Sequence, residues 1–476
     1  MVFLLALWTR ELDPARSLRK CLLATALGLC LFSDATGQDS PPAVWQASDD
    51  APSVTVFDHP ATTRWWISGQ LNVITQWHGA FPALYSGANS LRNTWESATS
   101  EVPTLYTGYR VTPRLQVLLD VEQAGGGGIS DALGVAGFTN LDVVRNPELS
   151  KAPYLAQGMI RYTIPLGSET VEADRGWLDV ATSQPARRIE IIAGKFGMPD
   201  FFDVNDVGSD SHLQFMNWTD DQNGAWDYAA NTRGYTDGVI VQYITPGWTL
   251  RYAAALMPKV ANGIYLDADI ARARGDNLEF EYHPALFRHD PTVIRFLSFV
   301  NHANMGSYRE AIDEYRAGVA SVPDITAVRR QGRVKYGFGV NLDQTLPRHF
   351  EAFARLGWND GRNESFAYSE VDRTVSGGVA LQGYAWHRGL DKIGAACVVN
   401  GISGDHREYL ALGGLGFLLG DGRLDYGTER IFEAYYNAHI WRGFFGALDL
   451  QHITDPGYNR ARGPVAVPAV RLHLDF

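Results

Sequence analysis

Cysteine is scarce in this chain, which contains Cys21, Cys30 and Cys397. The first two lie in an apolar run near the N-terminus that we interpret as part of a removable export signal. One remaining cysteine cannot form an internal disulfide, so the mature protein is not a disulfide-rich secreted scaffold. A chain of 476 residues without such cross-links needs another source of stability, and a large hydrogen-bonded sheet would supply it.

Long apolar runs and a basic charge balance are also missing. After residue 37 the sequence has no apolar run of the roughly 20 residues that a transmembrane helix needs. The formal net charge is -12, which argues against a nucleic-acid partner because such proteins present a basic face. An exported chain of this composition is either a soluble secreted protein or an outer-membrane barrel.

Catalytic signatures are absent as well. The chain has no GxSxG nucleophile elbow and no HExxH motif, and the glycine run at residues 125–128 lacks the Lys-Ser/Thr of a phosphate loop. Asp220 and Asp221 are adjacent carboxylates, but a glycosidase needs two carboxylates that flank one bond. The 12 histidines show no metal-ligand spacing. We predict that the protein is not an enzyme and requires no cofactor.

The N-terminus carries an export signal. Basic residues precede an apolar run at residues 21–32, and a small-x-small cleavage site follows at residues 33–35. Residues 1–15 lie before this signal, which is unusual for a signal peptide and is consistent with a start codon placed upstream of the true one. The predicted organisation is a signal peptide at residues 1–37, a periplasmic lead-in at 38–62 and a transmembrane barrel at 63–476.

From about residue 63 onward, apolar and polar residues alternate. One example is Leu115, Val117, Leu119 and Val121 alternating with Gln116, Asp120 and Glu122; another is Ala156, Gly158, Ile160 and Tyr162 alternating with Gln157, Arg161 and Thr163. A period of two predicts half-buried strands. The segments have about the ten residues of a tilted membrane-spanning strand. Their polar faces carry charges of both signs, which a dry core would penalise, so a barrel with a wet lumen is favoured.

Connector lengths give the strand count. Sixteen candidate strands begin near residues 64, 101, 114, 154, 187, 237, 248, 276, 292, 332, 349, 371, 391, 428, 443 and 466. Short and long connections alternate between them, as in barrels with periplasmic turns and external loops, and an even count returns both ends to the periplasm. The connection at residues 167–186 should be short and is not. We predict an all-β fold, a single transmembrane antiparallel β-barrel of 16 strands with long external loops.

Residues 194–238 combine many Asp and Asn residues with interleaved aromatics. Carboxylates and amides can pair with sugar hydroxyls, and aromatic rings can pack on the C–H face of a sugar. The alternative is a plain surface loop whose Asp and Asn residues cap turns. The stretch is the third external loop of the predicted barrel. By analogy with large general porins, we expect it to fold into the lumen as a constriction loop.

Several motifs resemble a known family. They include DFFDVND, QFMNW, NGAWDYAANTRGYTDG and the closing RLHLDF, and they span most of residues 190–476. The chain resembles the carbohydrate-selective porins of the OprB type. The resemblance implies a sixteen-stranded outer-membrane barrel through which sugars diffuse into the periplasm.

We therefore predict a passive outer-membrane porin that prefers small sugars. The alternatives are a non-selective porin, an outer-membrane glycan-acting enzyme and a soluble lectin-like β-protein. Candidate pore residues in the loop are Asp203, Asn205, Asp206, Asp210, Asn217, Trp218, Asn223, Trp226, Asp227, Asn231 and Arg233, with sugars expected to stack on Trp218 and Trp226. Candidates on the inward strand faces are Arg161, Arg251, Arg295, Arg355, Glu279, Glu281, Glu351 and Asp449; each could instead belong to a structural cross-strand ladder.

The remaining expectations concern ions and partners. The spacing of Asp203, Asn205, Asp206 and Asp210 could offer oxygen ligands to Ca²⁺, although it is not an EF-hand loop. The terminal aromatic residue Phe476 resembles the signal that barrels present to their insertion machinery. Membrane lipid and lipopolysaccharide are the expected surroundings, and the protein is expected to be a monomer or a homotrimer.

Overall fold

The structure is a computed structural model that describes residues 54–146, 149–284 and 291–476. The predicted signal peptide and most of the predicted lead-in lie outside the described residues. Across the parts of the chain that are described, no helix is both long enough and apolar enough to span a bilayer.

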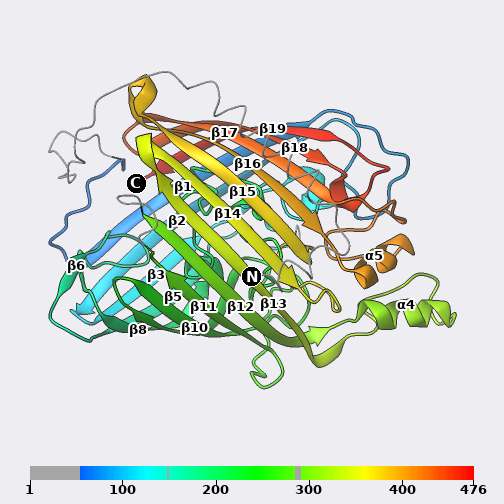
Figure 1. The fold of residues 1–476 in the computed structure, drawn as a ribbon, viewed down its shortest axis with the longest axis horizontal. Helices are drawn as coiled ribbons and strands as arrows, with labels where there is room; N and C mark the ends of the chain where they lie inside the picture. The colour runs from blue at the N-terminus through cyan, green and yellow to red at the C-terminus, as the bar shows by residue number, and fades with distance from the viewer. Residues whose placement is uncertain (1–53, 147–148, 285–290) are drawn as a thin grey trace. The chain divides into compact units, whose positions relative to one another are not determined.

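Sixteen long strands form a closed antiparallel barrel (Figure 1). They are β1 (Trp65–His78), β2 (Glu96–Thr112), β3 (Leu115–Glu122), β5 (Tyr154–Pro165), β8 (Arg188–Gly197), β9 (Tyr235–Ile244), β10 (Trp248–Leu256), β11 (Arg274–Tyr282), β12 (Thr292–Met305), β13 (Arg330–Leu346), β14 (Phe350–Asn359), β15 (Arg373–Gly383), β16 (Arg388–Gly401), β17 (Glu429–Trp441), β18 (Phe444–Thr454) and β19 (Val465–Asp475). The two-residue strand β4 (Gly125–Gly126) adds a short pairing to β2. Pairing of β1 with β19, from Gln70 opposite Asp475 to Gln76 opposite Ala469, closes the ring.

The connections contain the remaining elements. These are η1 (Ile129–Ala132), β6 (Thr170–Glu172), β7 (Ser183–Pro185), η2 (Met198–Asp200), α3 (Trp218–Asp221), α4 (Tyr308–Arg316), η3 (Pro347–His349), η4 (Tyr384–Trp386), α5 (Gly404–Ala411) and η5 (Pro456–Tyr458). Each predicted strand start lies within five residues of an observed one, so the predicted 16-stranded barrel is confirmed.

The strands present apolar side chains outward and polar side chains inward. In β11, Leu278 is 45% exposed, whereas Glu279 beside it is 0% exposed. This arrangement suits a wall between hydrocarbon and a polar lumen. The predicted alternation fails at Ala156, which is buried although we expected it on the outward face. The β3–β5 register shifts between Asp120 and Val121, and this irregularity brings Leu155 to the outward face.

The long connection between β5 and β8 folds back into the barrel. Its ends pair as the β6–β7 hairpin, and the residues between them reach the inner wall. The amide of Gln116 donates to the Asp179 carboxylate at 2.8 Å, and the Arg161 guanidinium donates to the Leu178 carbonyl at 2.8 Å. These contacts explain why this connection is longer than the other turns at the same end of the barrel.

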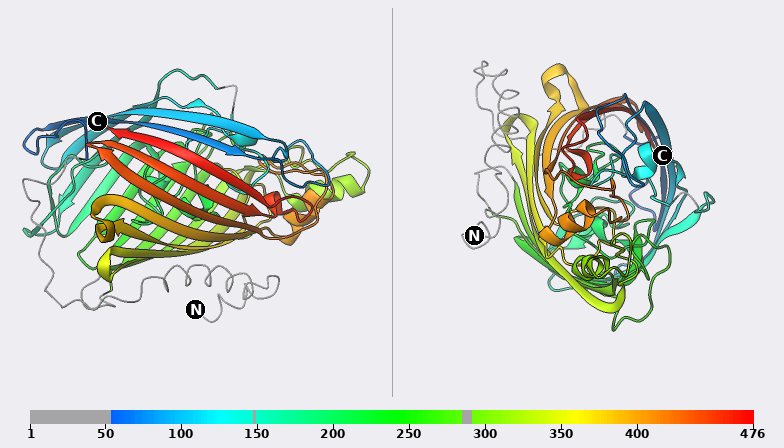
Figure 2. Two further views of the ribbon diagram at one scale, coloured as in Figure 1. Left: turned by 90° about the horizontal axis from the view of Figure 1, so that it is seen from above. Right: turned by 90° about the vertical axis from the view of Figure 1, so that its right-hand side faces the viewer.

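Much of the apolar core lies inside the barrel. Viewed along the barrel, loop segments lie inside the ring of strands (Figure 2). The connection between β8 and β9, residues 198–234, contributes buried side chains such as Phe202, Phe215 and Trp226. We call this segment the inner loop. Its burial confirms the predicted constriction loop as an in-folded element.

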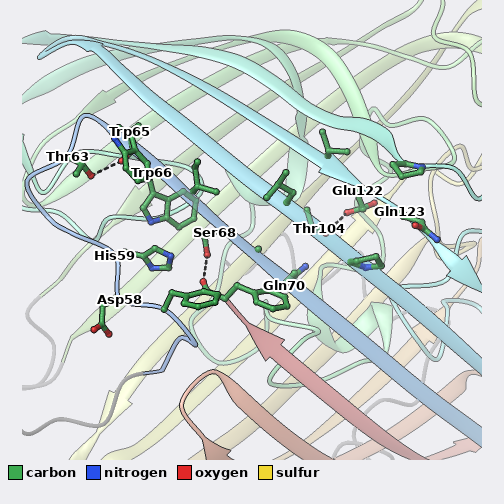
Figure 3. Close-up of a pocket in the computed structure, with 18 of the residues that line it drawn as sticks. Asp58, His59, Thr63, Trp65, Trp66, Ser68, Gln70, Thr104, Glu122 and Gln123 are labelled. Carbon is green, nitrogen blue, oxygen red and sulfur yellow. Dashed lines mark hydrogen bonds between the residues drawn. The ribbon is translucent and has the colours of Figure 1, made fainter.

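The chain end lies at the β1–β19 seam. The Phe476 amide donates to the Gly69 carbonyl at 2.8 Å, and the Ser68 hydroxyl donates to the Phe476 carbonyl at 2.8 Å. The preceding part of the chain reaches the same place, because the Val56 amide donates to the Asp475 carbonyl at 2.9 Å. A cavity of about 650 Å³ lies here, with His59 beside the strand β1 (Figure 3).

Candidate solute pathway

A buried ion pair fastens the start of the inner loop to the barrel wall. The Arg355 Nε lies 3.0 Å from Asp203 Oδ2, and neither side chain is appreciably exposed. The same carboxylate accepts from the Asn223 amide at 2.9 Å and from the Asn341 side chain at 3.0 Å. Both carboxylate oxygens of Asp203 thus accept a hydrogen bond from the protein, which compensates for its burial.

A second attachment lies farther along the loop. Asp227 forms an ion pair with Lys335 on β13 at 3.0 Å, and its carboxylate accepts from the backbone amides of Phe366 and Ala367. The indole of Trp226 donates to Asn277 on β11 at 2.9 Å. These bonds tie the loop to the inner wall and to the connection between β14 and β15.

The middle of the loop is attached to the strands at the C-terminal end. The Glu433 carboxylate on β17 accepts from the Met216 and Asn217 amides at 2.5 and 3.0 Å. The Asn217 side chain donates to Gln451 on β18 at 3.0 Å, and Arg471 on β19 donates to the Gln214 carbonyl at 2.8 Å. Most of the attachments therefore lie on β11 to β19. The opposite wall holds fewer of them, such as the hydrogen bond from the Gln157 amide on β5 to Asp200 at 2.8 Å.

A cavity of about 560 Å³ separates the inner loop from that opposite wall. Its wall residues come from β1, β2, β3, β5 and β19, and its other side comes from the inner loop and the in-folded β5–β8 connection. The wall contributes Gln70, Thr104, Tyr106, Asp120, Glu122, Gln157, His473 and Asp475, and the inner loop contributes Asp200, Asp210, His212, Leu213, Trp218, Asp221, Tyr228 and Arg233.

Aromatic rings line several sides of this cavity, namely Tyr106, Trp177, Trp218, Tyr228 and Tyr235. Tyr106 on β2 lies 5.7 Å from Trp177, measured between ring centroids. Trp218 is stacked on Tyr368 at 4.3 Å with an interplanar angle of 6°. Stacking fixes the orientation of each ring. The cavity therefore offers flat apolar surfaces held in place by neighbouring rings.

Tyrosines aside, most of the ionisable groups that line the cavity are carboxyl groups. These ionisable groups are the carboxyl groups of Asp120, Glu122, Asp200, Asp210, Asp221 and Asp475, the guanidinium of Arg233, and the imidazoles of His212 and His473. Asp475 forms an ion pair with His473 at 3.1 Å. The guanidinium of Arg233 stacks over the Tyr154 ring at 3.6 Å. Hydroxyl groups of a solute would thus meet mainly hydrogen-bond acceptors.

A histidine pair lies at one edge of the cavity. His212 stacks on His473 with centroids 5.5 Å apart, and its Nε2 lies 3.4 Å from Asp142. Burial disfavours the charged imidazole, but the hydrogen bond and the charge of Asp142 outweigh burial and raise the pKa of His212 to about 9. His212 is therefore protonated at neutral pH, and its charge acts most strongly on Asp142 and also on the cavity residues Asp210 and Asp475.

Three of the candidate residues from the loop line the cavity: Asp210, Trp218 and Arg233. The buried anchoring residues are Asp203, Asn205, Asn217, Asn223, Trp226, Asp227 and Asn231. Asp206 is exposed, outside the set of residues that line the cavity. Trp226 is 2% exposed and its indole N–H is already bonded.

Apart from Asp449, the candidate charges on the strand faces pair with charged residues of other strands or of the inner loop. Arg161 pairs with Glu190 at 2.6 Å, Arg251 with Glu279 at 2.5 Å, Arg295 with Glu281 at 2.8 Å, Glu351 with Lys392 at 2.6 Å, and Arg355 with Asp203 at 3.0 Å. Asp449 is buried on β18. None of these candidates belongs to the lining of the 560 Å³ cavity.

The residues of the opposite wall were not among the predicted pore residues. The alternation of β3 places Asp120 and Glu122 inward, which was an available signal. Trp177 lies in the connection whose length broke the barrel pattern, and that anomaly was the signal for an in-folded segment. On β2, Tyr106 lies two residues after Thr104 and therefore on the same face of the strand.

The residues whose spacing could suit Ca²⁺ form other bonds in the structure. Asp203 pairs with Arg355, and the Asn205 side-chain oxygen accepts from the Val207 and Gly208 amides. Asp210 accepts from the His212 amide at 3.0 Å. Among the described residues, no group of three or more His, Cys, Asp or Glu side chains is placed to hold a metal ion.

Comparison with known proteins identifies the family. The model of the carbohydrate-selective porin OprB family matches residues 87–476, which is most of the chain. The chain belongs to the OprB family. The protein is therefore a carbohydrate-selective porin of the outer membrane and not an enzyme, which removes the catalytic and soluble lectin-like alternatives.

A solved OprB structure supports the fold of this OprB-family porin. The chain is similar to OprB of Pseudomonas putida in its high-pH structure, with a TM-score of 0.65 and 15% identity over 87% of this chain and 94% of that one. The outer membrane channel DcaP of Acinetobacter baumannii matches with a TM-score of 0.46 and 10% identity over 87% and 97% of the two chains. No curated protein sequence matches the chain.

Proposed function

We propose that small sugars cross this porin between the inner loop and the wall formed by β1, β2, β3, β5 and β19. The observation that carries the proposal is the asymmetric fastening of the inner loop. Bonds to Arg355, Lys335 and Glu433 hold the loop against one side of the lumen. The 560 Å³ cavity lies on the other side.

The lining of the cavity supports preference for sugars. Aromatic surfaces such as Trp218 and Tyr106 suit the C–H faces of a pyranose, and carboxylates such as Asp210 and Asp120 accept from its hydroxyls. An amino acid of similar size has fewer hydroxyl donors and presents less C–H surface to the aromatic rings. Affinity must stay weak so that the solute can leave.

Liposome swelling with the purified porin tests the proposal. Neutral hexoses and disaccharides should enter faster than zwitterionic amino acids of similar size. Replacing Leu213, which faces the cavity, with Trp should slow sugar entry, whereas the same change at Leu448, which is 65% exposed on the outer face, should not. Equal entry of sugars and amino acids would contradict the proposal.

The outer surface and the chain end support further proposals about partners. Outward side chains such as Leu250 and Phe280 would contact membrane lipid and lipopolysaccharide. Phe476, which ends the last strand at the seam with β1, would be recognised by the barrel-insertion machinery. Deleting Phe476 should lower the amount of assembled barrel in the outer membrane without changing sugar preference in refolded protein.

Removal of residues 1–37 as a signal peptide remains a prediction that N-terminal sequencing would test.

A further inference from the structure

One part of the cavity wall is a row of hydrogen-bond acceptors. Tyr106 on β2 lies directly opposite Asp120 on β3, and Asp120 lies directly opposite Gln157 on β5. Directly opposed side chains on one face of a sheet are neighbours. The Gln157 amide extends the row by donating to Asp200 at 2.8 Å. The row therefore places two carboxylates and an amide beside an aromatic ring.

The carboxyl group of Asp120 is buried without a hydrogen bond or ion pair to any other described residue. It is 1% exposed, it lines the cavity, and both of its carboxylate oxygens are without a hydrogen bond among the described residues. The side-chain oxygen of Gln157, which is 4% exposed, also lacks a donor within the described residues. Buried acceptors are normally satisfied, so this pair is available to a donor that enters the cavity.

The neighbouring carboxylates add to the negative charge. Glu122, two residues beyond Asp120, accepts from the hydroxyls of Tyr154 and Tyr235, which are neutral donors. No ion pair to Asp120, Glu122 or Asp200 is found in the described parts of the chain, whereas Glu190, Glu279 and Glu281 elsewhere on the inner wall each pair with an arginine. This corner of the cavity is thus acidic, and the cavity cations His212 and Arg233 form no ion pair with its carboxyl groups in the described parts of the chain.

We infer that this acidic corner makes the porin favour protonated amino sugars over neutral sugars, and neutral sugars over acidic ones. The inference rests on the proposed pathway through the cavity. An ammonium group in place of a hydroxyl supplies three donors and a positive charge to the unpaired acceptors. Tyr106 and Trp177 hold flat apolar surfaces next to the same acceptors. A uronate would bring a like charge into a confined site, which is unfavourable.

Flux measurements with an amino sugar, a neutral sugar and an acidic sugar test the inference. Liposomes containing the porin are assayed with glucosamine, N-acetylglucosamine and glucuronate, each at matched osmolarity and with a control for the membrane potential. We expect glucosamine to enter several-fold faster than glucuronate, with the neutral N-acetylglucosamine between them, because a few unscreened charges in a pore change local solute concentration by about tenfold. Equal rates for glucosamine and glucuronate would overturn the inference.

Substitutions that each remove one carboxyl group test whether the acidic corner causes this selectivity. Asp120→Asn and Asp200→Asn should each reduce the ratio of glucosamine to glucuronate entry by about two- to fivefold. The matched control is Asp237→Asn, which removes the same charge from an exposed side chain of β9. Heat-dependent mobility on a gel verifies that each variant is a folded barrel. A ratio that falls equally in Asp237→Asn would overturn the inference, because net charge rather than the corner would then set selectivity.

The outcome separates this inference from the proposed function. If N-acetylglucosamine and neutral hexoses enter readily while the charged sugars do not differ, the acidic-corner inference fails and the sugar pathway stands. If neutral sugars enter no faster than amino acids of their size, the proposed function itself fails. The reversal potential in a salt gradient gives a second measure, and an anion-selective wild-type channel would also overturn the inference.

Discussion

Arg355 on β14 and Asp203 at the start of the inner loop form an ion pair 3.0 Å long inside the barrel, with side-chain exposures of 0% and 2%. The same guanidinium donates to the Asp220 carbonyl at 2.8 Å and to the Ser209 hydroxyl at 2.7 Å. One wall residue therefore fixes three points of the loop. We infer that this junction determines where the lumen is closed and where it is open.

Removing the guanidinium should loosen the inner loop. In Arg355→Ala, Asp203 keeps its burial but loses its counter-charge, a change that costs about 3–5 kcal/mol in buried pairs. We expect larger and noisier single-channel conductance and a weaker preference for sugars. Arg114→Ala, which removes an exposed arginine from the short β2–β3 turn, is the control. A conductance in Arg355→Ala equal to that of wild type would show that the pair does not position the loop.

The two tryptophans of the inner loop should differ in effect. Trp218 lines the cavity, so Trp218→Ala should lower the sugar preference measured by liposome swelling. Trp226 is buried and bonded to Asn277, so Trp226→Ala should instead reduce barrel stability by about 3–5 kcal/mol. The temperature at which the folded form is lost on a gel measures this second effect. If Trp226→Ala alone changes sugar preference, the assignment of these two residues is wrong.

The charge selectivity of the channel should depend on pH near neutrality. Burial raises the pKa of Asp200 to about 7, with hydrogen bonds from Gln157 and Gly197 opposing the shift and Glu122 adding to it. The ionisable groups that face Asp200 are Asp120 and Glu122 on β3, with Tyr228 and Tyr235. Lowering the pH through about 7 protonates Asp200 and removes one negative charge.

We therefore expect cation preference, read from reversal potentials, to be stronger at about pH 8.5 than at about pH 5.5. The Asp200→Asn variant lacks the titrating carboxyl, so its reversal potential should change less over this interval. If the reversal potential of Asp200→Asn changes with pH as much as that of the wild type, a group other than Asp200 titrates.

The barrel itself could be predicted because its determinants are local. Alternation along a strand such as Leu278 to Tyr282 follows from which face meets hydrocarbon, and connector lengths set the strand order. The irregularity at Ala156 could not be foreseen, because it depends on pairing between β3 and β5. The in-folded segment around Trp177 was detectable only as a connection that is too long.

The site could be predicted less well than the fold. The Asp and Asn residues of the inner loop were expected to face solute, yet Asp203 and Asp227 are anchored by Arg355 and Lys335 across more than 100 residues of sequence. A carboxylate that binds solute and one that anchors a loop have the same sequence pattern. Asp120, on the inward face of β3, has no hydrogen bond from another described residue, and a sequence does not reveal this.

Blocking the cavity chemically tests the central claim most directly. Leu213→Cys places a thiol in the cavity and Leu448→Cys places one on the outer face, both with Cys397 retained. Each purified variant is labelled with a bulky thiol reagent, and the entry of a neutral hexose into liposomes is compared before and after labelling. We predict a several-fold loss of sugar entry for labelled Leu213→Cys and no loss for labelled Leu448→Cys. Unchanged sugar entry in fully labelled Leu213→Cys would show that solutes do not pass between the inner loop and the opposite wall.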